Sequence, residues 1–227
     1  RAAADWQGAP GAALVETVDA PRATTTLASL LLERPAARPD IPLLRWRAGR
    51  DSLVTDLTAG VQGRGGTAPA VAAGSVFRIE QGGGGRWYGL HAEWNRMSPG
   101  TAGADYRLLQ VTGTREPLVF YAPNLERGRS DPQAEIRDAA DVTLFYLKAE
   151  TLPGRAGGQS VLRISGAEDI ALYGYSGNAA PQGRPLVTVQ DSRRVLLANL
   201  MPVRPDQAFS TLEIAAAGAD PGASVRR

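Results

Sequence analysis

Apolar and polar positions alternate along the second half of the chain in a pattern that recurs. Each recurrence is a short alternating strand, a polar corner and a second apolar strand. Three segments show it most clearly: AEIRDAADVTLFYLKAE from Ala134, VLRISGAEDIALYGYSGN from Val161 and LVTVQDSRRVLLANLMPV from Leu186. Their first-strand anchors Ile136, Ile164 and Val189 are 28 and 25 residues apart, and the second-strand anchors Val142, Ile170 and Val195 keep the same spacings. The three segments are therefore copies of one unit.

Three earlier segments fit the same unit progressively less closely, and they begin at Tyr106, Ser75 and Ile41. One strand–corner–strand unit cannot bury its apolar side alone, but stacked copies share a continuous core and pair equivalent strands. We therefore predict an all-β fold, a parallel β-helix (solenoid) of about six coils. We assign residues 1–40 to an N-terminal arm or cap, 41–205 to the β-helix and 206–227 to a C-terminal strand and loose tail.

The pattern of apolar and polar residues predicts different outer faces for the two strands of each unit. In the second strands, Val142 and Leu144 are expected to point inward. The alternate positions form one outward column of unusually apolar residues: Leu90, Tyr121, Phe145, Tyr173 and Ala198. Such a column is unexpected on a free surface. Near the start of the chain, TTTLASLLLERP predicts a short amphipathic stretch, with Thr25 or Thr26 as its N-cap and Pro35 ending it.

Composition excludes several function classes. The 227 residues include no cysteine and one histidine, which removes disulfides, thiol nucleophiles and cysteine-ligated metals. A net charge of +2 from 25 basic and 23 acidic residues is no footprint of nucleic-acid binding. No apolar run is long enough for a membrane-spanning helix. The start, RAAADWQGAP, lacks a signal-peptide pattern, so we expect a processed or truncated chain.

The quoted repeats resemble the right-handed parallel β-helix of the pectate-lyase-like superfamily, over roughly residues 75–203. That superfamily includes polysaccharide lyases, polygalacturonase-type glycoside hydrolases and phage tailspikes. The resemblance implies a right-handed coil and a carbohydrate-active protein, secreted or at the cell surface. The single lysine beside 24 arginines, with abundant alanine, indicates a GC-rich bacterial genome. The chain lacks the paired aspartates of polygalacturonases and the calcium-binding aspartate cluster of pectate lyases, so the reaction type stays open.

Polar residues just past the second strands form the candidate catalytic site. Superposing the copies places Glu93, Asn124, Lys148 and Ser176 in one column and Asn95, Glu126, Glu150 and Asn178 in the next. Glu126 and Glu150 on adjacent coils are candidates for an acid and base pair, because neighbouring carboxylates push their pKa values apart. Lys148 is a candidate base for a proton next to a uronic carboxylate, with Arg127 as an alternative partner. The same residues also fit a solvated Glu–Lys–Glu ladder that only spaces the coils.

The expected substrate-binding residues surround these columns: Asn124, Arg127, Trp94, His91, Tyr121 and Tyr173. His91 suits a general base near pH 7, although a histidine among aromatic residues is more often a packed structural residue. Trp87, Tyr88 and Trp94 fit either sugar stacking or the core. Glycines 82–85 predict a flexible corner and no phosphate-binding loop.

Two function classes follow from these features. The first is a protein that cleaves or binds a polysaccharide, with no cofactor expected and carboxylate-only calcium binding on the loops left open. The second is a non-catalytic structural or assembly module. In that case the aromatic column is covered by a second copy of the chain or by a missing N-terminal segment. Neither class involves nucleic acid or a membrane span.

Overall fold

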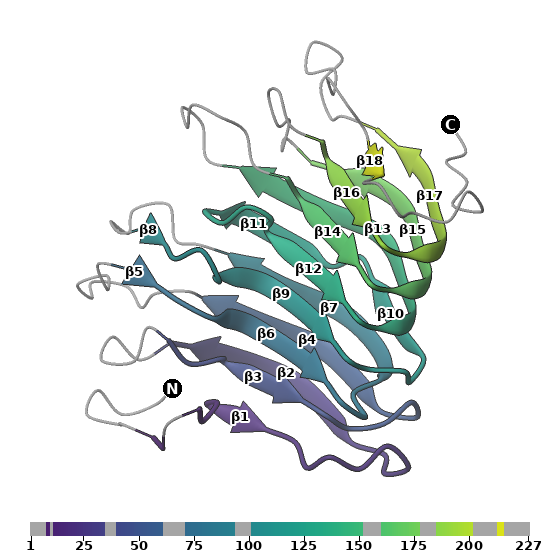
Figure 1. Ribbon diagram of the computed structural model, residues 1–227. Helices are drawn as coiled ribbons and strands as arrows, with labels where there is room; N and C mark the ends of the chain where they lie inside the picture. Colours follow the sequence, from purple (N-terminus) through teal and green to yellow (C-terminus); the bar gives the residue numbers. More distant parts are fainter. Residues whose placement is uncertain are drawn as a thin grey trace.

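The chain folds into a stack of coils in which each strand lies beside its equivalent from the next repeat (Figure 1). The computed structural model describes residues 8–9, 11–34, 40–60, 71–93, 101–151, 160–177, 185–201 and 213–215. These residues form strands, turns and bends and include no helix. Among them, no helical segment of the length and apolarity needed to cross a bilayer occurs.

Two parallel sheets of eight strands each form the walls of the stack. The short-strand sheet consists of β1 (Val15–Glu16), β3 (Leu44–Trp46), β6 (Ser75–Glu80), β9 (Arg107–Thr112), β12 (Ala134–Arg137), β14 (Leu162–Ser165), β16 (Val187–Gln190) and β18 (Glu213–Ala215). The long-strand sheet consists of β2 (Thr26–Glu33), β4 (Leu53–Gly60), β7 (Gly85–Glu93), β10 (Leu118–Tyr121), β11 (Asn124–Gly128), β13 (Ala140–Thr151), β15 (Glu168–Ser176) and β17 (Arg193–Leu200). A separate pair joins β5 (Val71–Ala72) to β8 (Thr101–Ala102).

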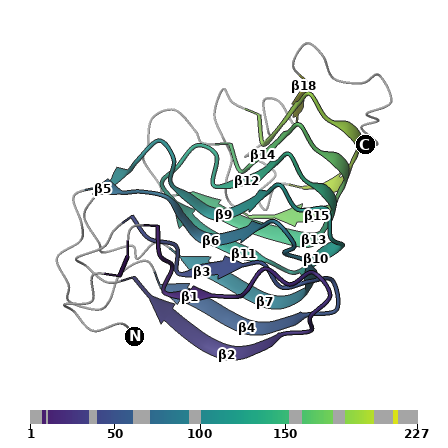
Figure 2. The same cartoon turned by 60° about the horizontal axis from the view of Figure 1, so that its bottom comes forward.

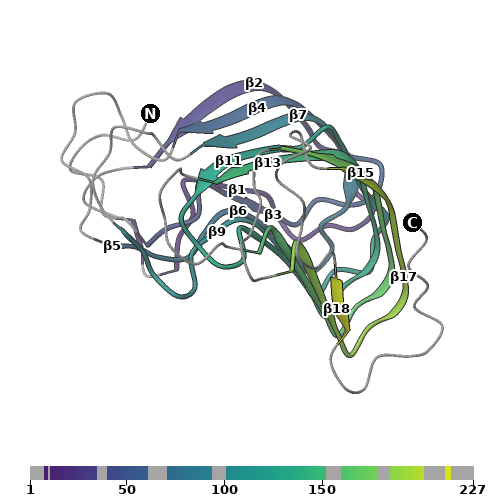
Figure 3. The same cartoon turned by 90° about the horizontal axis from the view of Figure 1, so that it is seen from above.

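The predicted in-phase stacking is confirmed. Ile136 lies opposite Ile164, and Ile164 lies opposite Val189 in the next strand. Viewed from above, the coils superpose, and the long-strand sheet follows the outside of a bend whose inner side is the short-strand sheet (Figure 3). The parallel β-solenoid is thus the fold of this chain, while its right-handed sense stays a prediction.

The core fills the space between the two sheets with apolar side chains from every repeat. Its largest members include Trp46 and Trp87, whose rings meet edge to face with centroids 5.3 Å apart. Trp46 also donates a hydrogen bond of 2.9 Å to the carbonyl of Gly84. Trp87 therefore belongs to the core, which excludes the sugar-stacking role considered for it.

A left-handed residue bends each long strand at the same position. The residues concerned are Ser29, Asp56, Gly89, Ala122, Tyr146, Gly174 and Asn199, with φ between 51° and 82°. Because this bend shifts the alternation by one residue, Val142 and Leu144 point inward before it, whereas Leu147 and Ala149 point inward after it. The outer face of the long-strand sheet is consequently divided into two strips.

This bend corrects the position assigned to Leu90. Leu90 follows Gly89, and its side chain is buried in the core. The outward residue paired with Tyr121 is Tyr88, two positions earlier. The predicted column therefore contains Tyr88 in place of Leu90. Leu90 was placed outward because strict alternation of inward and outward side chains does not allow for a left-handed residue inside the strand.

The beginning of the solenoid also differs from the prediction. The stretch expected to be an amphipathic helix is the strand β2, which pairs with β4 over its whole length. Strands β1 and β2 form the N-terminal end of the stack, one in each sheet (Figure 2). The coils therefore start before residue 41. A left-handed Ser29 gives β2 the uneven apolar spacing that imitates a helix.

The glycine run at 82–85 is a close approach between coils and not only a loose corner. A Cβ on Gly85 would lie 2.4 Å from the carbonyl oxygen of Ser52 in the neighbouring coil. One on Gly84 would lie 2.9 Å from the carbonyl oxygen of Pro117. Backbone atoms cannot move aside at low cost, so any larger residue at either position would separate the coils.

Candidate functional site

The candidate site lies on the outer face of the long-strand sheet, just after the left-handed bend. Strands β7, β11 and β13 place His91, Asn124 and Lys148 directly opposite one another, and Ser176 on β15 continues this column. We call these four residues the polar column. In the neighbouring column Glu93 lies opposite Glu126. The prediction paired Glu93 with Asn124, because it took the spacing between these two coils to be two residues shorter than it is.

Lys148 joins the two carboxylates proposed as an acid and base pair. Its Nζ lies 2.5 Å from Glu126 Oε1 and 3.2 Å from Glu150 Oε1. The same oxygen of Glu126 accepts a hydrogen bond of 2.7 Å from Asn124 Nδ2. The Glu126 side chain is only 12% exposed, so these two donors replace most of its hydration.

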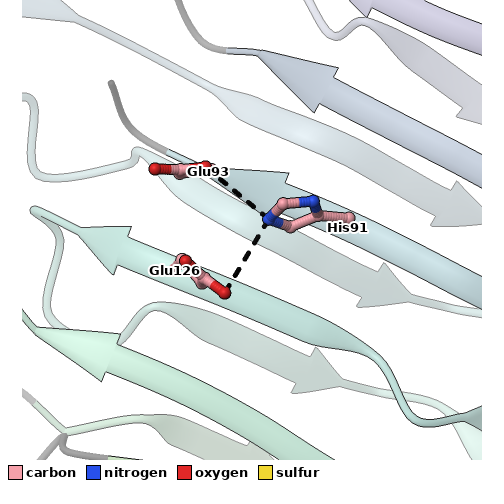
Figure 4. A group of neighbouring side chains, drawn as sticks. All are labelled: His91, Glu93 and Glu126. Carbon is pink, nitrogen blue, oxygen red and sulfur yellow. Dashed lines mark ion pairs between the residues drawn. The ribbon is translucent and has the colours of Figure 1, made fainter. Parts of the chain in front are cut away.

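His91 lies between the two glutamates of the neighbouring column (Figure 4). Its Nε2 is 3.8 Å from Glu93 Oε2 and 4.0 Å from Glu126 Oε1, distances too long for hydrogen bonds. This nitrogen is buried and has no hydrogen-bond partner. Glu93 forms an ion pair with Arg127 through its other oxygen. The structure thus brings together six of the predicted site residues, namely His91, Asn124, Glu126, Arg127, Lys148 and Glu150.

The electrostatics of the cluster assign a charge to each group. Burial lowers the pKa of His91 below 6.5, and Lys148 and Arg127 add to this effect against the opposing pull of Glu126. Burial acts to raise the pKa of Glu126, but the hydrogen bonds from Lys148 and Asn124 outweigh it and hold that pKa below 4.5. The hydrogen bond to Glu126 raises the pKa of Lys148 above 10.5. Near pH 7 the cluster therefore contains a neutral imidazole, an ionised Glu126 and an ammonium group.

His91, Glu93 and Glu126 also have the composition of a metal site. One ligand atom from each lies within 4.8 Å of the others. However, both carboxylates are already paired with cations of the protein, Glu93 with Arg127 and Glu126 with Lys148. A divalent ion would have to displace both side chains. The arrangement is accordingly a self-neutralised ion-pair cluster.

The aromatic column forms a continuous stack beside the cluster, on the other side of the bend. The centroid separations are 4.4 Å between Tyr88 and Tyr121, 5.4 Å between Tyr121 and Phe145, and 5.2 Å between Phe145 and Tyr173. The rings are nearly parallel, so each inner ring has both faces covered by its neighbours. We call this stack the aromatic ladder. Tyr121 therefore offers a ligand only its edge, whereas Tyr173 has one face directed toward the small Ala198.

Two residues complete the account of the predicted site, one outside the described structure and one missed. Trp94, expected to bind substrate, lies outside the described residues. Tyr146 was not predicted, although it stands on the outer face two residues before Lys148 and is 72% exposed. The residues at equivalent positions, Gly89, Gly174 and Asn199, are typical of left-handed backbone and would have marked this position as a bend.

Comparisons of the chain with protein-family models, with curated proteins and with solved structures find no match. The parallel β-solenoid is consistent with the resemblance to the pectate-lyase-like superfamily, which rests on the sequence pattern of the repeats. The functional argument therefore depends on the geometry of the outer face.

Proposed function

We propose that this chain binds an acidic polysaccharide along the outer face of the long-strand sheet and cleaves it beside His91. The supporting observation is the pair of parallel columns on that face. The aromatic ladder and the polar column both repeat from coil to coil, at the roughly 4.8 Å spacing of neighbouring strands. A surface that repeats along one direction suits a ligand that repeats as well, and a polysaccharide is such a ligand.

Two cations of the site could bind an acidic sugar in exchange for their present glutamate partners. Arg127 and Lys148 offer guanidinium and ammonium donors, and Asn124 offers an amide beside them. The raised pKa of Lys148 keeps its ammonium charged throughout the neutral range. A uronate carboxylate could exchange for Glu93 or Glu150 as the partner of these cations. Charge-assisted hydrogen bonds of this kind are stronger than neutral ones.

Elimination fits the site better than hydrolysis does. Hydrolysis by two carboxyl groups requires one of them to be protonated, yet Glu126 is held ionised and Glu150 contacts the same ammonium. Elimination requires a base for the proton next to the uronate carboxylate and cations to stabilise the charge that develops. The neutral His91 is the candidate base, with Lys148 and Arg127 as the cations. The proton moves to the imidazole, and its bonding electrons form the new carbon–carbon double bond. The carbon–oxygen bond to the leaving group breaks, and the glycosidic oxygen departs with that electron pair and takes a proton from solvent.

Product analysis tests this proposal. The protein is incubated with polygalacturonate, alginate and the neutral polymer hydroxyethylcellulose, and both ultraviolet absorbance and reducing ends are followed. Elimination yields an unsaturated uronate that absorbs, whereas hydrolysis yields reducing ends alone. We expect absorbance from an acidic polymer, and we expect His91→Gln to abolish it.

A matched control distinguishes the site from general effects of charge. Glu80 on the short-strand sheet is 15% exposed and paired with two arginines, much as Glu126 is paired in the cluster. Glu80→Gln is expected to leave the rate unchanged, whereas Glu126→Gln, which loosens Lys148, is expected to lower it. Reducing ends without absorbance would overturn the elimination step. Absence of both products from every acidic polymer would overturn cleavage.

The alternative of a structural module receives less support from the aromatic ladder than the sequence suggested. Since the rings cover one another, the ladder needs no second chain to shield its faces. Light scattering distinguishes the two functions. A defined oligomer that neither binds nor cleaves any of the three polymers would favour the module.

A further inference from the structure

Tyr146 is the most exposed aromatic side chain among the described residues. It is 72% exposed, compared with 39% for Tyr88 and 37% for Tyr173 at the two ends of the aromatic ladder. It lies on β13, on the same outer face as the charged cluster and two residues before Lys148. Its position therefore combines a large apolar surface with immediate proximity to the proposed ligand site.

The backbone of Tyr146 is strained. Its φ of 56° lies in the left-handed region, where a bulky residue is a rare exception. The same bend is made by Gly89, Gly174 and Asn199 in other coils, and these residue types tolerate it well. A ring so exposed gains little from packing to offset the strain. The bend itself belongs to the fold, since it recurs in every coil, but among the residues that make it only Tyr146 has a large side chain.

The ring of Tyr146 lies against Gly174 of the next coil. Tyr146 lies opposite Gly174, because the flanking pairs are Phe145 with Tyr173 and Leu147 with Tyr175. A Cβ on Gly174 would lie 2.9 Å from Cδ1 and 3.3 Å from Cε1 of the ring. The absence of a side chain at Gly174 thus makes room for the ring to lie against the sheet. Ala122, at the equivalent position on the preceding coil, is also small, so no large side chain stands beside the ring on that side.

We propose that the Tyr146 ring is a platform on which one pyranose ring of the bound polysaccharide stacks. The inference rests on the proposed function and adds a binding position to it. A pyranose ring presents a face of C–H groups, and the electron-rich face of an aromatic ring attracts the positive edge of such a group. The inner ladder rings have no free face, whereas Tyr146 directs one toward solvent. A sugar stacked there would lie beside the polar column, because Lys148 is two residues further along the same strand.

Affinity electrophoresis measures this directly. The full chain and its variants migrate through gels containing polygalacturonate, alginate or hydroxyethylcellulose, and the retardation gives the affinity. Tyr146→Phe keeps the ring and should bind within about twofold of the wild type. Tyr146→Asn removes the ring and should bind roughly tenfold more weakly, equivalent to about 1.4 kcal/mol. Val18→Asn is the control, since Val18 is 79% exposed but follows β1 of the short-strand sheet, away from the proposed ligand face.

The melting temperature separates binding from structure. Asparagine suits the left-handed backbone, so Tyr146→Asn should melt at the same temperature as the wild type or higher. Equal retardation of Tyr146→Asn and the wild type would overturn the platform and leave the proposed function standing. A marked fall in the melting temperature of Tyr146→Asn that accounts for its loss of binding would also overturn the platform and leave the proposed function standing. Retardation by hydroxyethylcellulose alone, dependent on Tyr146, would support the platform and contradict an acidic ligand. No retardation of the wild type in any gel would overturn both.

Discussion

Lys148 on β13 and Glu126 on β11 form an ion pair of 2.5 Å between adjacent coils, and the same ammonium lies 3.2 Å from Glu150. One cation therefore bridges two carboxylates from neighbouring coils. Lys148→Met would leave both of them without it. Because Lys148 is partly exposed and screened by solvent, we expect a loss of only about 1 kcal/mol in the free energy of unfolding, measured by urea denaturation. Lys148→Arg should retain most of the stability, and a Lys148→Met chain as stable as the wild type would contradict the pairing.

The pH dependence of stability follows from the lowered pKa of Glu126. Since this pKa is lower in the folded chain than in the unfolded one, the unfolded chain binds more protons in acid. The stabilisation is present above the ordinary pKa of 4.5 and is lost as the pH falls through the folded value. Thermal melts between neutral and acidic pH should show the wild type losing its advantage over Glu126→Gln. A difference that stays constant with pH would show that Glu126 gains nothing from its ionisation.

The pH dependence of cleavage follows from His91. The base must be neutral, so the rate should rise with pH and level off once the imidazole is deprotonated. Burial lowers the pKa of His91, which places the midpoint of this rise below 6.5. Initial rates on the best acidic polymer measure it. A midpoint well above 6.5, or one that persists in His91→Gln, would assign the base to another group.

The aromatic ladder predicts unequal effects along its length. Tyr121 stacks on two rings, at 4.4 Å and 5.4 Å, whereas Tyr173 stacks on one, at 5.2 Å. Each such contact contributes about 1 kcal/mol beyond the area that it buries. Tyr121→Leu should therefore destabilise the chain about twice as much as Tyr173→Leu, as measured by urea unfolding. Equal losses would mean that the rings contribute by burial alone.

The core of the solenoid was predictable because hydrophobic burial constrains sequence directly. Ile136, Ile164 and Val189 occupy one inward position, and each must be apolar whatever the corners between them do. The spacing of these anchors therefore specifies the register of the last coils without any other information. The same argument predicted the neighbours Lys148 and Ser176, which lie in those coils.

The bends were not predictable by alternation, because a left-handed residue changes direction without changing hydrophobicity. At Gly89 the bend turns Leu90 inward, against the alternation. Separately, the predicted spacing between β7 and the next coil was two residues too short, which removed His91 from the polar column. At Ser29 the same bend made a strand resemble a helix. Gly89, Gly174 and Asn199 mark the bend in three of the coils, since these residue types favour left-handed backbone.

The protonation states of the cluster cannot be predicted from the spacing of residues in the sequence. The sequence placed Lys148 and Glu126 in adjacent polar columns just past the second strands, whereas they lie within β13 and β11. Which group donates to which depends on side-chain reach across the coils. The donors around Glu126 indicate an ionised carboxylate, and the burial of His91 indicates a neutral imidazole. These two properties favour elimination with His91 as base over the lysine base that sequence reasoning suggested.

Carboxylate labelling with mass spectrometry tests most directly whether a polysaccharide occupies the outer face of the long-strand sheet. Glu93 on that face and Glu16 on the short-strand sheet are 31% and 34% exposed, and each forms an ion pair with an arginine. With a saturating acidic polymer that the chain retains in gels, labelling of Glu93 should fall severalfold while labelling of Glu16 stays constant. Unchanged labelling of Glu93, or protection of Glu16 in its place, would contradict this location for the ligand.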